Sequence, residues 1–193
     1  MMRQPAKVLE TEDVSRVLAH IGQQRNVVRN QVMVLLSFKA GLRACEIAGL
    51  EWQMILLSNG KVAKSIAIAK SIAKKGSGRT IPLNATLRQK ICKLHGEMGK
   101  PITGPIILSE RGKHMSARSV VNWFRATYAE LGLEGCSSHS GRRTFITKAA
   151  RALSQTGGSL RDIQELAGHR ALTTTERYIQ GDRMVQRQLV GLI

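Results

Sequence analysis

The sequence predicts a mainly α-helical domain with one small antiparallel β-hairpin, an α+β fold. Apolar residues recur at the helical spacing i, i+3, i+4 and i+7 within residues 11–50 and again after residue 84. Between these regions, apolar side chains alternate with small or polar ones over residues 62–68, and a Lys-Lys-Gly-Ser-Gly turn precedes a second run at residues 79–83. We therefore expect the hairpin to lie between two groups of helices.

The first group comprises two amphipathic helices and a short third one. The first begins at Thr11, before two acidic residues, and the second ends near Gly41, which suits a C-terminal cap. The third covers residues 43–50. The first apolar face is Val14, Val17, Leu18 and Ile21, and the second is Val28, Val32, Leu35 and Leu36. Each spacing predicts a helix docked through one face.

The second group opens with two helices that begin after typical N-cap residues, Asn84 and Ser116. A short strand is expected between them, at residues 105–108. The apolar faces of the two helices are Leu87, Ile91, Leu94 and Met98, and then Val121, Phe124, Tyr128 and Leu131.

The C-terminal third predicts three more helices. One covers residues 141–153, and the next covers residues 159–168, including its Ser cap and its closing Gly. A last helix, capped by Thr173 or Thr174, carries Tyr178. The stretch between the first two is too short for a domain linker, so we expect one compact domain.

The composition is strongly basic. The chain has 30 Lys and Arg residues and only 13 Asp and Glu residues, which gives a formal net charge of +17. The positive charge is spread along the whole chain. This pattern is typical of a nucleic-acid binder. A membrane-surface protein would normally show an amphipathic helix with basic and apolar faces, and an acidic protein partner would need only a local patch. A solvated basic surface is the alternative. Aromatic residues make up only 4%, which disfavours single-strand binding by stacking, so duplex DNA is the expected partner.

The cysteines and the N-terminal segment indicate the cellular compartment in which the protein is expected. Cys45, Cys92 and Cys136 are an odd number at wide spacing, which favours a reducing environment over a disulfide framework. We find no apolar run typical of a signal peptide or of a membrane span. We therefore expect a cytoplasmic protein with no membrane partner.

The C-terminal third concentrates residues suited to phosphodiester transfer. His139 precedes Arg142 by three residues, which places both on one helical face, and Tyr178 follows His169 by nine residues. The transition state spreads negative charge over non-bridging oxygens, which preorganised arginines stabilise. A tyrosine hydroxyl, with a pKa of about 10, needs neighbouring cations or a base in order to attack. For the His–Arg pair alone, a surface couple is the alternative.

These residues resemble the tyrosine recombinase (phage integrase) family. Residues 139–145, HSGRRTF, are similar to its H-x-x-R box, and residues 166–170, LAGHR, are similar to its L-G-H box. Residues 41–50, GLRACEIAGL, are similar to its G-L-R-x-x-E segment, and Tyr178 falls where the family keeps its nucleophile. The resemblance runs from about Leu9 to Tyr178 and implies the tyrosine recombinase catalytic-domain fold.

The resemblance also implies the role of each catalytic residue. Arg43 and Arg142 would clamp the scissile phosphate. His139 and His169 would assist proton movement and donate hydrogen bonds to the phosphate oxygens. Tyr178 would form a 3′-phosphotyrosyl bond and release a 5′-hydroxyl.

Supporting roles follow from the same resemblance. Glu46 would hold the arginine segment together, and the hairpin would bring a lysine to the leaving oxygen. Counting back from Arg79 and Pro82 in the pattern K-x-G-x-x-R-x-[VI]-P selects Lys74, with Lys75 as the alternative. Because the bond energy is kept in the phosphotyrosine, we expect no cofactor, no metal and no ATP.

Two residues depart from the family pattern. Gly141 stands where the family has a large apolar residue, so we expect looser packing behind this box or compensation from elsewhere. Arg143 replaces a common His or Lys, which we expect to be harmless. Larger family members carry an N-terminal DNA-clamping domain, so we expect this chain to be either a fragment or a short member with the catalytic domain alone.

We expect a catalytic DNA breaking-rejoining domain at residues 1–183 and a tail at residues 184–193 that docks on a neighbouring subunit or on its own domain. The function implied is site-specific recombination of duplex DNA, for integration, excision or inversion. Pairwise strand exchange implies a tetramer on two DNA sites, with a monomer or dimer as the alternatives without DNA, and with accessory DNA-bending proteins as further partners. The alternative functions are a tyrosine-type topoisomerase, which religates the same strand, and a non-catalytic DNA-binding protein with this fold.

The remaining aromatic residues and histidines have simpler interpretations. We expect Tyr128, Trp52 and Trp123 in the core. Three histidines are expected at the surface: His20, His95 and His114. A zinc site is an alternative for three proper ligands, Cys136, His139 and His169, but no fourth ligand has matching local spacing.

Overall fold

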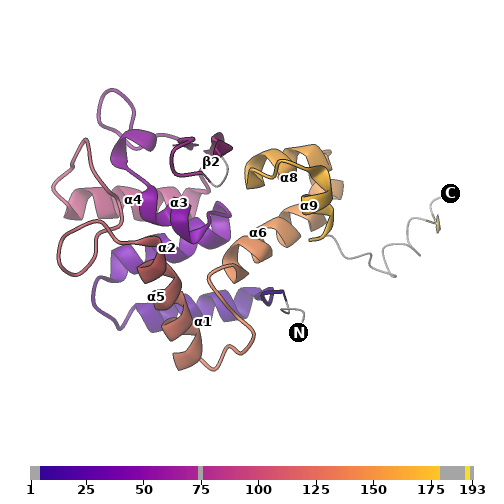
Figure 1. Cartoon of the computed structure of the whole chain (residues 1–193), viewed down its shortest axis with the longest axis horizontal. Helices are drawn as coiled ribbons and strands as arrows, with labels where there is room; N and C mark the ends of the chain where they lie inside the picture. Colours follow the sequence, from indigo (N-terminus) through magenta and orange to yellow (C-terminus); the bar gives the residue numbers. More distant parts are fainter. Residues whose placement is uncertain (1–4, 74–75, 179–189, 192–193) are drawn as a thin grey trace.

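The computed structural model describes residues 5–73, 76–178 and 190–191 (Figure 1). Its elements, in chain order, are α1 (Thr11–Ile21), α2 (Val27–Lys39), α3 (Ala44–Gly49), the 3-10 turn η1 (Trp52–Met54), β1 (Ser65–Ile68), β2 (Arg79–Pro82), α4 (Ala85–Glu97), α5 (Ala117–Glu130), α6 (Ser140–Arg151), α7 (Leu153–Thr156), α8 (Leu160–Ala167) and α9 (Leu172–Glu176). The order of helices, one hairpin and further helices confirms the predicted fold class.

The core is built around α2. This helix contacts α1, α3, α4 and α6, and α5 packs against α3 on the outside (Figure 1). The sequence predicts one apolar face for α2, but the structure buries it on nearly all sides because Met33, Val34 and Phe38 occupy the remaining positions. Neighbouring helices therefore cover most of the surface of α2.

The hairpin has the predicted antiparallel pairing. Ile66 pairs with Ile81 and Ile68 pairs with Arg79, so that the isoleucines on both strands point into the core. The first strand begins later than predicted, since Val62 forms only an isolated bridge with Leu56. The second strand lies beside α8, which brings the hairpin next to the C-terminal helices (Figure 1).

The N-terminal ends of three helices test the predicted caps. The side chains of Asn84 and Ser116 accept hydrogen bonds from backbone N–H groups in the first turns of α4 and α5, which confirms both caps. The helix start predicted at Thr11 is also confirmed, because Thr11 is the first helical residue of α1 and Glu10 holds the N-cap position.

The strand predicted at residues 105–108 does not form. Pro105 bridges to Glu51, whereas Leu108 bridges to His114. The two ends of the segment therefore pair with different partners over one residue each, and no continuous ladder is possible.

The last helices differ in detail from the prediction. The helix expected at residues 141–153 ends at Arg151, and α7 follows over part of the stretch between the two predicted helices. The helix α8 ends at Gly168 as predicted. The helix α9 begins after Ala171 and stops at Glu176, so Tyr178 lies just beyond it, and neither expected threonine is its cap.

The C-terminal helices form a second, smaller apolar cluster. Ile146 of α6 packs with Ile163 and Ala167 of α8, and Phe145 and Tyr178 pack against them. Figure 1 shows α6 extending from the main body toward α8 and α9. The helix α6 therefore connects the cluster that carries Tyr178 to the core around α2.

Of the side chains expected in the core, Trp52 and Tyr128 are fully buried, which confirms their assignment, while Trp123 is half-buried against the core. The surface assignment of His95 is wrong. Its ring lies 4.5 Å from that of Trp52, and its Nε2 is 3.0 Å from the carbonyl oxygen of Pro101. None of the helices in the described part of the chain is long and apolar enough to cross a bilayer.

Of the two expectations for the packing behind the H-x-x-R box, looser packing is wrong, and compensation from elsewhere is confirmed because α2 fills the space beside Gly141. A Cβ atom at this position would lie 2.8 Å from Cβ of Ser37 and 2.9 Å from Cδ2 of Phe38, both on α2. Real Cβ contacts are essentially never that short. The glycine therefore allows α6 to approach α2 closely, and the box is tightly packed.

We expect Gly141→Ala to lower the free energy of unfolding by about 1–3 kcal/mol, because the added methyl group overpacks the contact between α6 and α2. The matched control is Gly96→Ala in α4, where an added Cβ meets nothing within 4 Å. The control should leave stability unchanged or raise it by up to about 1 kcal/mol. Urea denaturation of both variants measures the difference, and equal stabilities would contradict the close approach.

Candidate active site

Four separate segments meet at one place on the molecule. Arg43 is the N-cap residue of α3, Arg79 opens β2, and Arg142 lies in the first turn of α6. His169 directly follows the glycine that ends α8. Because these segments are far apart in sequence, only the folded chain brings their side chains together.

Glu46 is the centre of the cluster. Its carboxylate is fully buried, and Arg43 donates to it from Nη1 at 3.0 Å and from its backbone N–H at 2.9 Å. Arg79 donates to both carboxylate oxygens, from Nη1 at 2.8 Å and from Nη2 at 3.1 Å. This bidentate pair fixes the plane of both groups.

The protonation state of Glu46 follows from these contacts. Burial acts to raise the pKa of the carboxyl group, but the hydrogen bond and charge of Arg79 and the contacts of Arg43 outweigh burial and lower the pKa. The carboxylate is therefore ionised at neutral pH, and the pair of arginines keeps its counter-charge.

Arg142 is also buried, and backbone carbonyl groups hold its guanidinium. Nη1 donates to the carbonyl oxygen of Gly41 and Nη2 to that of Ala167, both at 2.6 Å. Burial, followed by the charge of Arg43, lowers the pKa of Arg142 to about 10, so the group still carries its charge at neutral pH. Arg142 thus joins the start of α3, the body of α6 and the end of α8.

Gly41 has to be a glycine for this arrangement. Its φ of +63° lies in the left-handed region, and a Cβ would lie 2.5 Å from Cδ1 of Phe145. Both constraints favour glycine at the residue whose carbonyl receives Arg142.

His169 is held at its backbone and at its ring. Its N–H donates to the carbonyl oxygen of Gln164 across the left-handed Gly168, which closes α8. Its Nδ1 lies 2.9 Å from Oγ1 of Thr175. Burial, and then the charge of Arg142 and the other arginines, lowers the pKa of His169 to about 4, so the imidazole is neutral at pH 7.

Tyr178 lies half-buried between two side chains of the site. Its ring stacks on that of His169 at a centroid distance of 5.6 Å and an interplanar angle of 22°. Cζ of Arg143 lies 5.8 Å from the centroid of the Tyr178 ring. Arg143, which departs from the family pattern, therefore has a cation–π contact with the expected nucleophile.

The structure brings together five of the residues predicted for the site: Arg43, Glu46, Arg142, His169 and Tyr178. His139 is exposed at the N-cap of α6, three residues before Arg142. Lys74 and Lys75 lie outside the described residues, as do residues 184–189 and 192–193 of the tail.

Sequence reasoning missed three residues of the cluster. Arg79 served only to align the lysine, yet its guanidinium pairs with Glu46 and its Nε donates to the carbonyl oxygen of Leu166 at 2.7 Å. The position of Arg79 in the K-x-G-x-x-R pattern was the feature of the sequence that could have indicated its place in the site. Gln164 and Thr175, which contact His169, carried no signal in one sequence because polar residues are common in surface helices.

A cavity of about 650 Å³ adjoins the cluster between the hairpin and α8. Arginines line it on both sides, together with the imidazole of the site: Arg79, Arg161, Arg170 and His169. Two carboxylates, Asp162 and Glu165, share the lining, so the cavity next to His169 carries only a small excess of positive charge.

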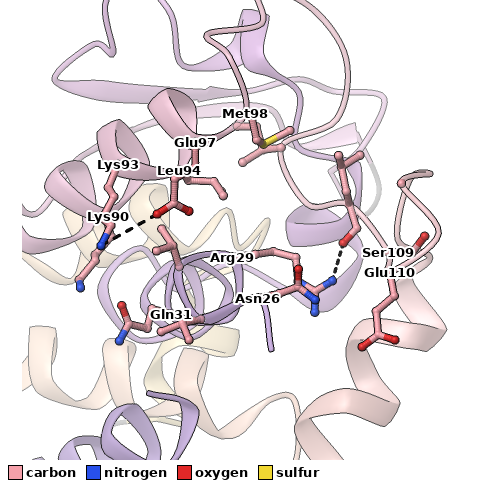
Figure 2. Close-up of a pocket in the computed structure, with 15 residues that line it drawn as sticks. Asn26, Arg29, Gln31, Lys90, Lys93, Leu94, Glu97, Met98, Ser109 and Glu110 are labelled. Carbon is pink, nitrogen blue, oxygen red and sulfur yellow. Dashed lines mark hydrogen bonds and ion pairs between the residues drawn. The ribbon is translucent and has the colours of Figure 1, made fainter. Parts of the chain in front are cut away.

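A larger cavity of about 800 Å³ lies at the N-terminal end of α2, away from the cluster around Glu46 (Figure 2). Arg29 of α2 donates from Nη1 to the carbonyl oxygen of Leu108 at 2.8 Å and holds the loop of residues 105–112 against α2. Two carboxylates, Glu97 and Glu110, share the lining with Arg29 and the lysines of α4. None of the residues predicted for the active site lines this cavity.

The zinc alternative has no support in the structure. Among residues 5–73, 76–178 and 190–191, no group of three or more His, Cys, Asp or Glu side chains is placed to hold a metal ion. Cys136, His139 and His169 therefore do not form a metal site here.

Comparisons with known proteins agree on one family. The model of the "Phage integrase family" matches residues 7–184. A tyrosine recombinase XerC of Yersinia pestis is 31% identical over 181 residues, which are 91% of this chain and 55% of the relative. The XerC of Pelobacter propionicus is 30% identical over 163 residues, covering 82% of this chain and 50% of the relative. The chain thus spans about half the length of these curated relatives.

Solved structures show the same fold. The Tn1549 transposon integrase in complex with transposon right end DNA matches with a TM-score of 0.76 at 17% identity, over 98% of this chain and 67% of that one. The integrase from mycobacterium phage Brujita matches with a TM-score of 0.58 at 26% identity, over 91% of this chain and 55% of that one.

The buried carboxylate leads to a stability prediction. Glu46→Gln keeps the shape of the side chain but leaves Arg43 and Arg79 without their counter-charge, so we expect the free energy of unfolding to fall by about 3 kcal/mol or more. The control is Glu97→Gln, because Glu97 pairs with Lys93 at 3.9 Å on the surface and should contribute less than about 1 kcal/mol. Urea denaturation at pH 7 compares them, and a small loss in both variants would contradict the role given to Glu46.

Proposed function

Because the chain belongs to the phage integrase family, we propose that it is a site-specific DNA recombinase that cuts and rejoins duplex DNA through a covalent bond to Tyr178. The observation that carries this proposal is the packing of Tyr178 against His169 within a cluster that contains Arg43 and Arg142. A phosphate placed beside the phenol would meet two fixed positive charges and a neutral imidazole. The formal net charge of +17 favours DNA as the partner.

The names of related proteins point the same way. The XerC relatives are named tyrosine recombinases, and the solved XerH structures are recombinases bound to difH substrate. The structural matches below 25% identity support the fold alone, so the catalytic step rests on the residues of this chain.

The proposed reaction is a transesterification at phosphorus. The oxygen of Tyr178 attacks the scissile phosphate, the P–O5′ bond breaks, and a 3′-phosphotyrosine forms while a 5′-hydroxyl leaves. The phenol loses one proton and the 5′-oxygen gains one. A 5′-hydroxyl from another strand then reverses the step, so the number of phosphoester bonds is conserved and no nucleotide hydrolysis is needed.

Arg43 and Arg142 would stabilise the charge that develops on the non-bridging oxygens. Both are oriented before any substrate binds, Arg43 by Glu46 and Arg142 by two carbonyl groups. Donors that need no reorganisation during the reaction stabilise a transition state most strongly. Glu46 itself would touch no substrate, and its role would be to hold Arg43 in place.

The proton transfers would involve the two histidines and a lysine of the hairpin. His139 would assist the proton transfer at the phenol, and His169 would donate a hydrogen bond to a phosphate oxygen. Lys74, with Lys75 as the alternative, would protonate the leaving 5′-oxygen, since a lysine beside other cations has a lowered pKa and gives up its proton more readily.

We also propose a tetramer on two DNA sites, because strand exchange needs two duplexes that are each cut on both strands. The tail at residues 184–193 would dock on a neighbouring subunit. Joining of a strand to a second duplex would support recombination, whereas resealing of the same strand, seen as relaxation of supercoiled DNA, would support a topoisomerase.

The covalent step can be tested with a nicked duplex that carries the target site. Wild-type protein should form a denaturant-resistant adduct, and Tyr178→Phe should bind the same DNA without trapping it, because the attacking oxygen is missing. The matched control is Tyr128→Phe. The hydroxyl of Tyr128 is buried without a hydrogen-bond partner among the described residues, so its loss should leave trapping intact.

Adduct formation by Tyr178→Phe at the wild-type level would overturn the assignment of the nucleophile. Loss of the adduct in both tyrosine variants would point to damage to the fold instead. DNA binding without an adduct in the wild-type protein would favour the non-catalytic binder.

A further inference from the structure

The contact between His169 and Thr175 joins two groups that can each donate or accept a hydrogen bond. Both side chains are buried, and Nδ1 of the imidazole lies 2.9 Å from Oγ1 of the threonine. Two arrangements fit this distance. Either the hydroxyl donates to an unprotonated Nδ1, or Nδ1–H donates to the hydroxyl oxygen.

The surroundings of Thr175 favour the first arrangement. A threonine in a helix often donates its hydroxyl proton to a carbonyl oxygen one turn earlier, as Thr156 does to Ala152. Among the described residues, His169 Nδ1 is the partner of Oγ1 of Thr175. If Nδ1 carried the proton, the buried hydroxyl would lack an acceptor, which costs about 1–3 kcal/mol.

We propose that Thr175 is a positioning residue whose hydroxyl donates to Nδ1 of His169 and so keeps the imidazole proton on Nε2. Only Nε2–H can then serve as a hydrogen-bond donor to a phosphate oxygen in the site. In its catalytic consequence this inference rests on the proposed function, and it makes His169 a neutral donor to the phosphate and not the base that accepts the phenol proton.

The backbone around His169 is held as firmly as its ring. The side-chain amide of Gln164 donates to the carbonyl oxygens of His169 at 3.0 Å and Arg170 at 3.1 Å. The charged groups that act on the ring are three arginines, Arg142, Arg43 and Arg79, and the carboxylate of Glu46. These charges disfavour an imidazolium, so the tautomer of the neutral ring decides what His169 can donate.

Thr175 also connects His169 to the nucleophile. The N–H of Tyr178 donates to the carbonyl oxygen of Thr175 at 3.0 Å, so the turn that places the phenol starts from the residue that orients the imidazole. Formation of α9 therefore sets both the tautomer of His169 and the position of Tyr178.

The tautomer can be read directly by NMR of the full chain labelled with ¹⁵N. Long-range couplings between ring protons and ring nitrogens distinguish Nε2–H from Nδ1–H. We expect wild-type His169 to carry its proton on Nε2 at pH 7. We expect Thr175→Ser to keep this state and Thr175→Val, which preserves the shape without the hydroxyl, to give a mixture of tautomers. Thr174→Val, at an exposed neighbouring position, is the matched control and should match the wild type.

Cleavage provides a second readout. Thr175→Val should slow single-turnover cleavage of the nicked duplex by about tenfold or more, as loss of an orienting partner of a functional histidine commonly does. The dissociation constant for DNA should stay within about twofold, and Thr175→Ser should restore the rate.

Proton placement on Nδ1 in the wild type, or an unchanged tautomer and cleavage rate in Thr175→Val, would overturn the inference. An Nδ1–H signal in the wild type overturns the inference even if the valine variant does not fold. If the tautomer responds as expected but the wild-type protein forms no DNA adduct, the proposed function fails while the role of Thr175 in orienting His169 stands. If the adduct forms but wild-type His169 carries its proton on Nδ1, only the inference fails.

Discussion

The buried carboxylate of Glu46 is the interaction on which the rest of the site depends. It binds Arg43 at the start of α3 and Arg79 at the start of β2, and Arg79 in turn donates to Leu166 near the end of α8. One carboxylate thus connects the helical core, the hairpin and the C-terminal helices. Without these partners, burial of the ionised carboxylate would cost so much free energy that the group would move to the solvent or take up a proton. The three segments therefore stabilise one another through Glu46.

Arg142 also connects the helical core to the C-terminal helices. Its two bonds to carbonyl oxygens, at Gly41 and Ala167, fasten α6 to the start of α3 and to the end of α8. Glycines provide the room at the contacts. A Cβ on Gly168 would lie 2.9 Å from Nη1 of Arg79, and one on Gly141 would meet Phe38 at the same distance. The cluster of positive charge is therefore built before a phosphate arrives, and substrate binding would not have to gather it.

Much of the fold and of the site was predictable from local patterns. Helical periodicity, the alternation around Ile66 and the cap residues Asn84 and Ser116 depend on neighbours in sequence, which one chain displays. That Arg43, Arg142, His169 and Tyr178 share one site was implied by the resemblance of the short motifs to the tyrosine recombinase family, not by local patterns. Residues that act through distant partners were not visible, since Arg79 and Glu46 are separated by 33 positions. Close packing was also missed, because the fit of Gly141 against α2 depends on both helices at once.

The central claim is that this cluster stabilises a transition state and does more than anchor DNA, and Arg142→Ala tests it most directly. Single-turnover cleavage and the dissociation constant for DNA would be measured on the same duplex. We expect cleavage to slow by about 100-fold or more, equivalent to about 3 kcal/mol, while DNA binding weakens only a fewfold. Arg151→Ala, at the exposed end of the same helix, controls for the loss of one positive charge. Comparable losses in cleavage and in binding for Arg142→Ala would contradict the claim and make Arg142 a phosphate anchor only.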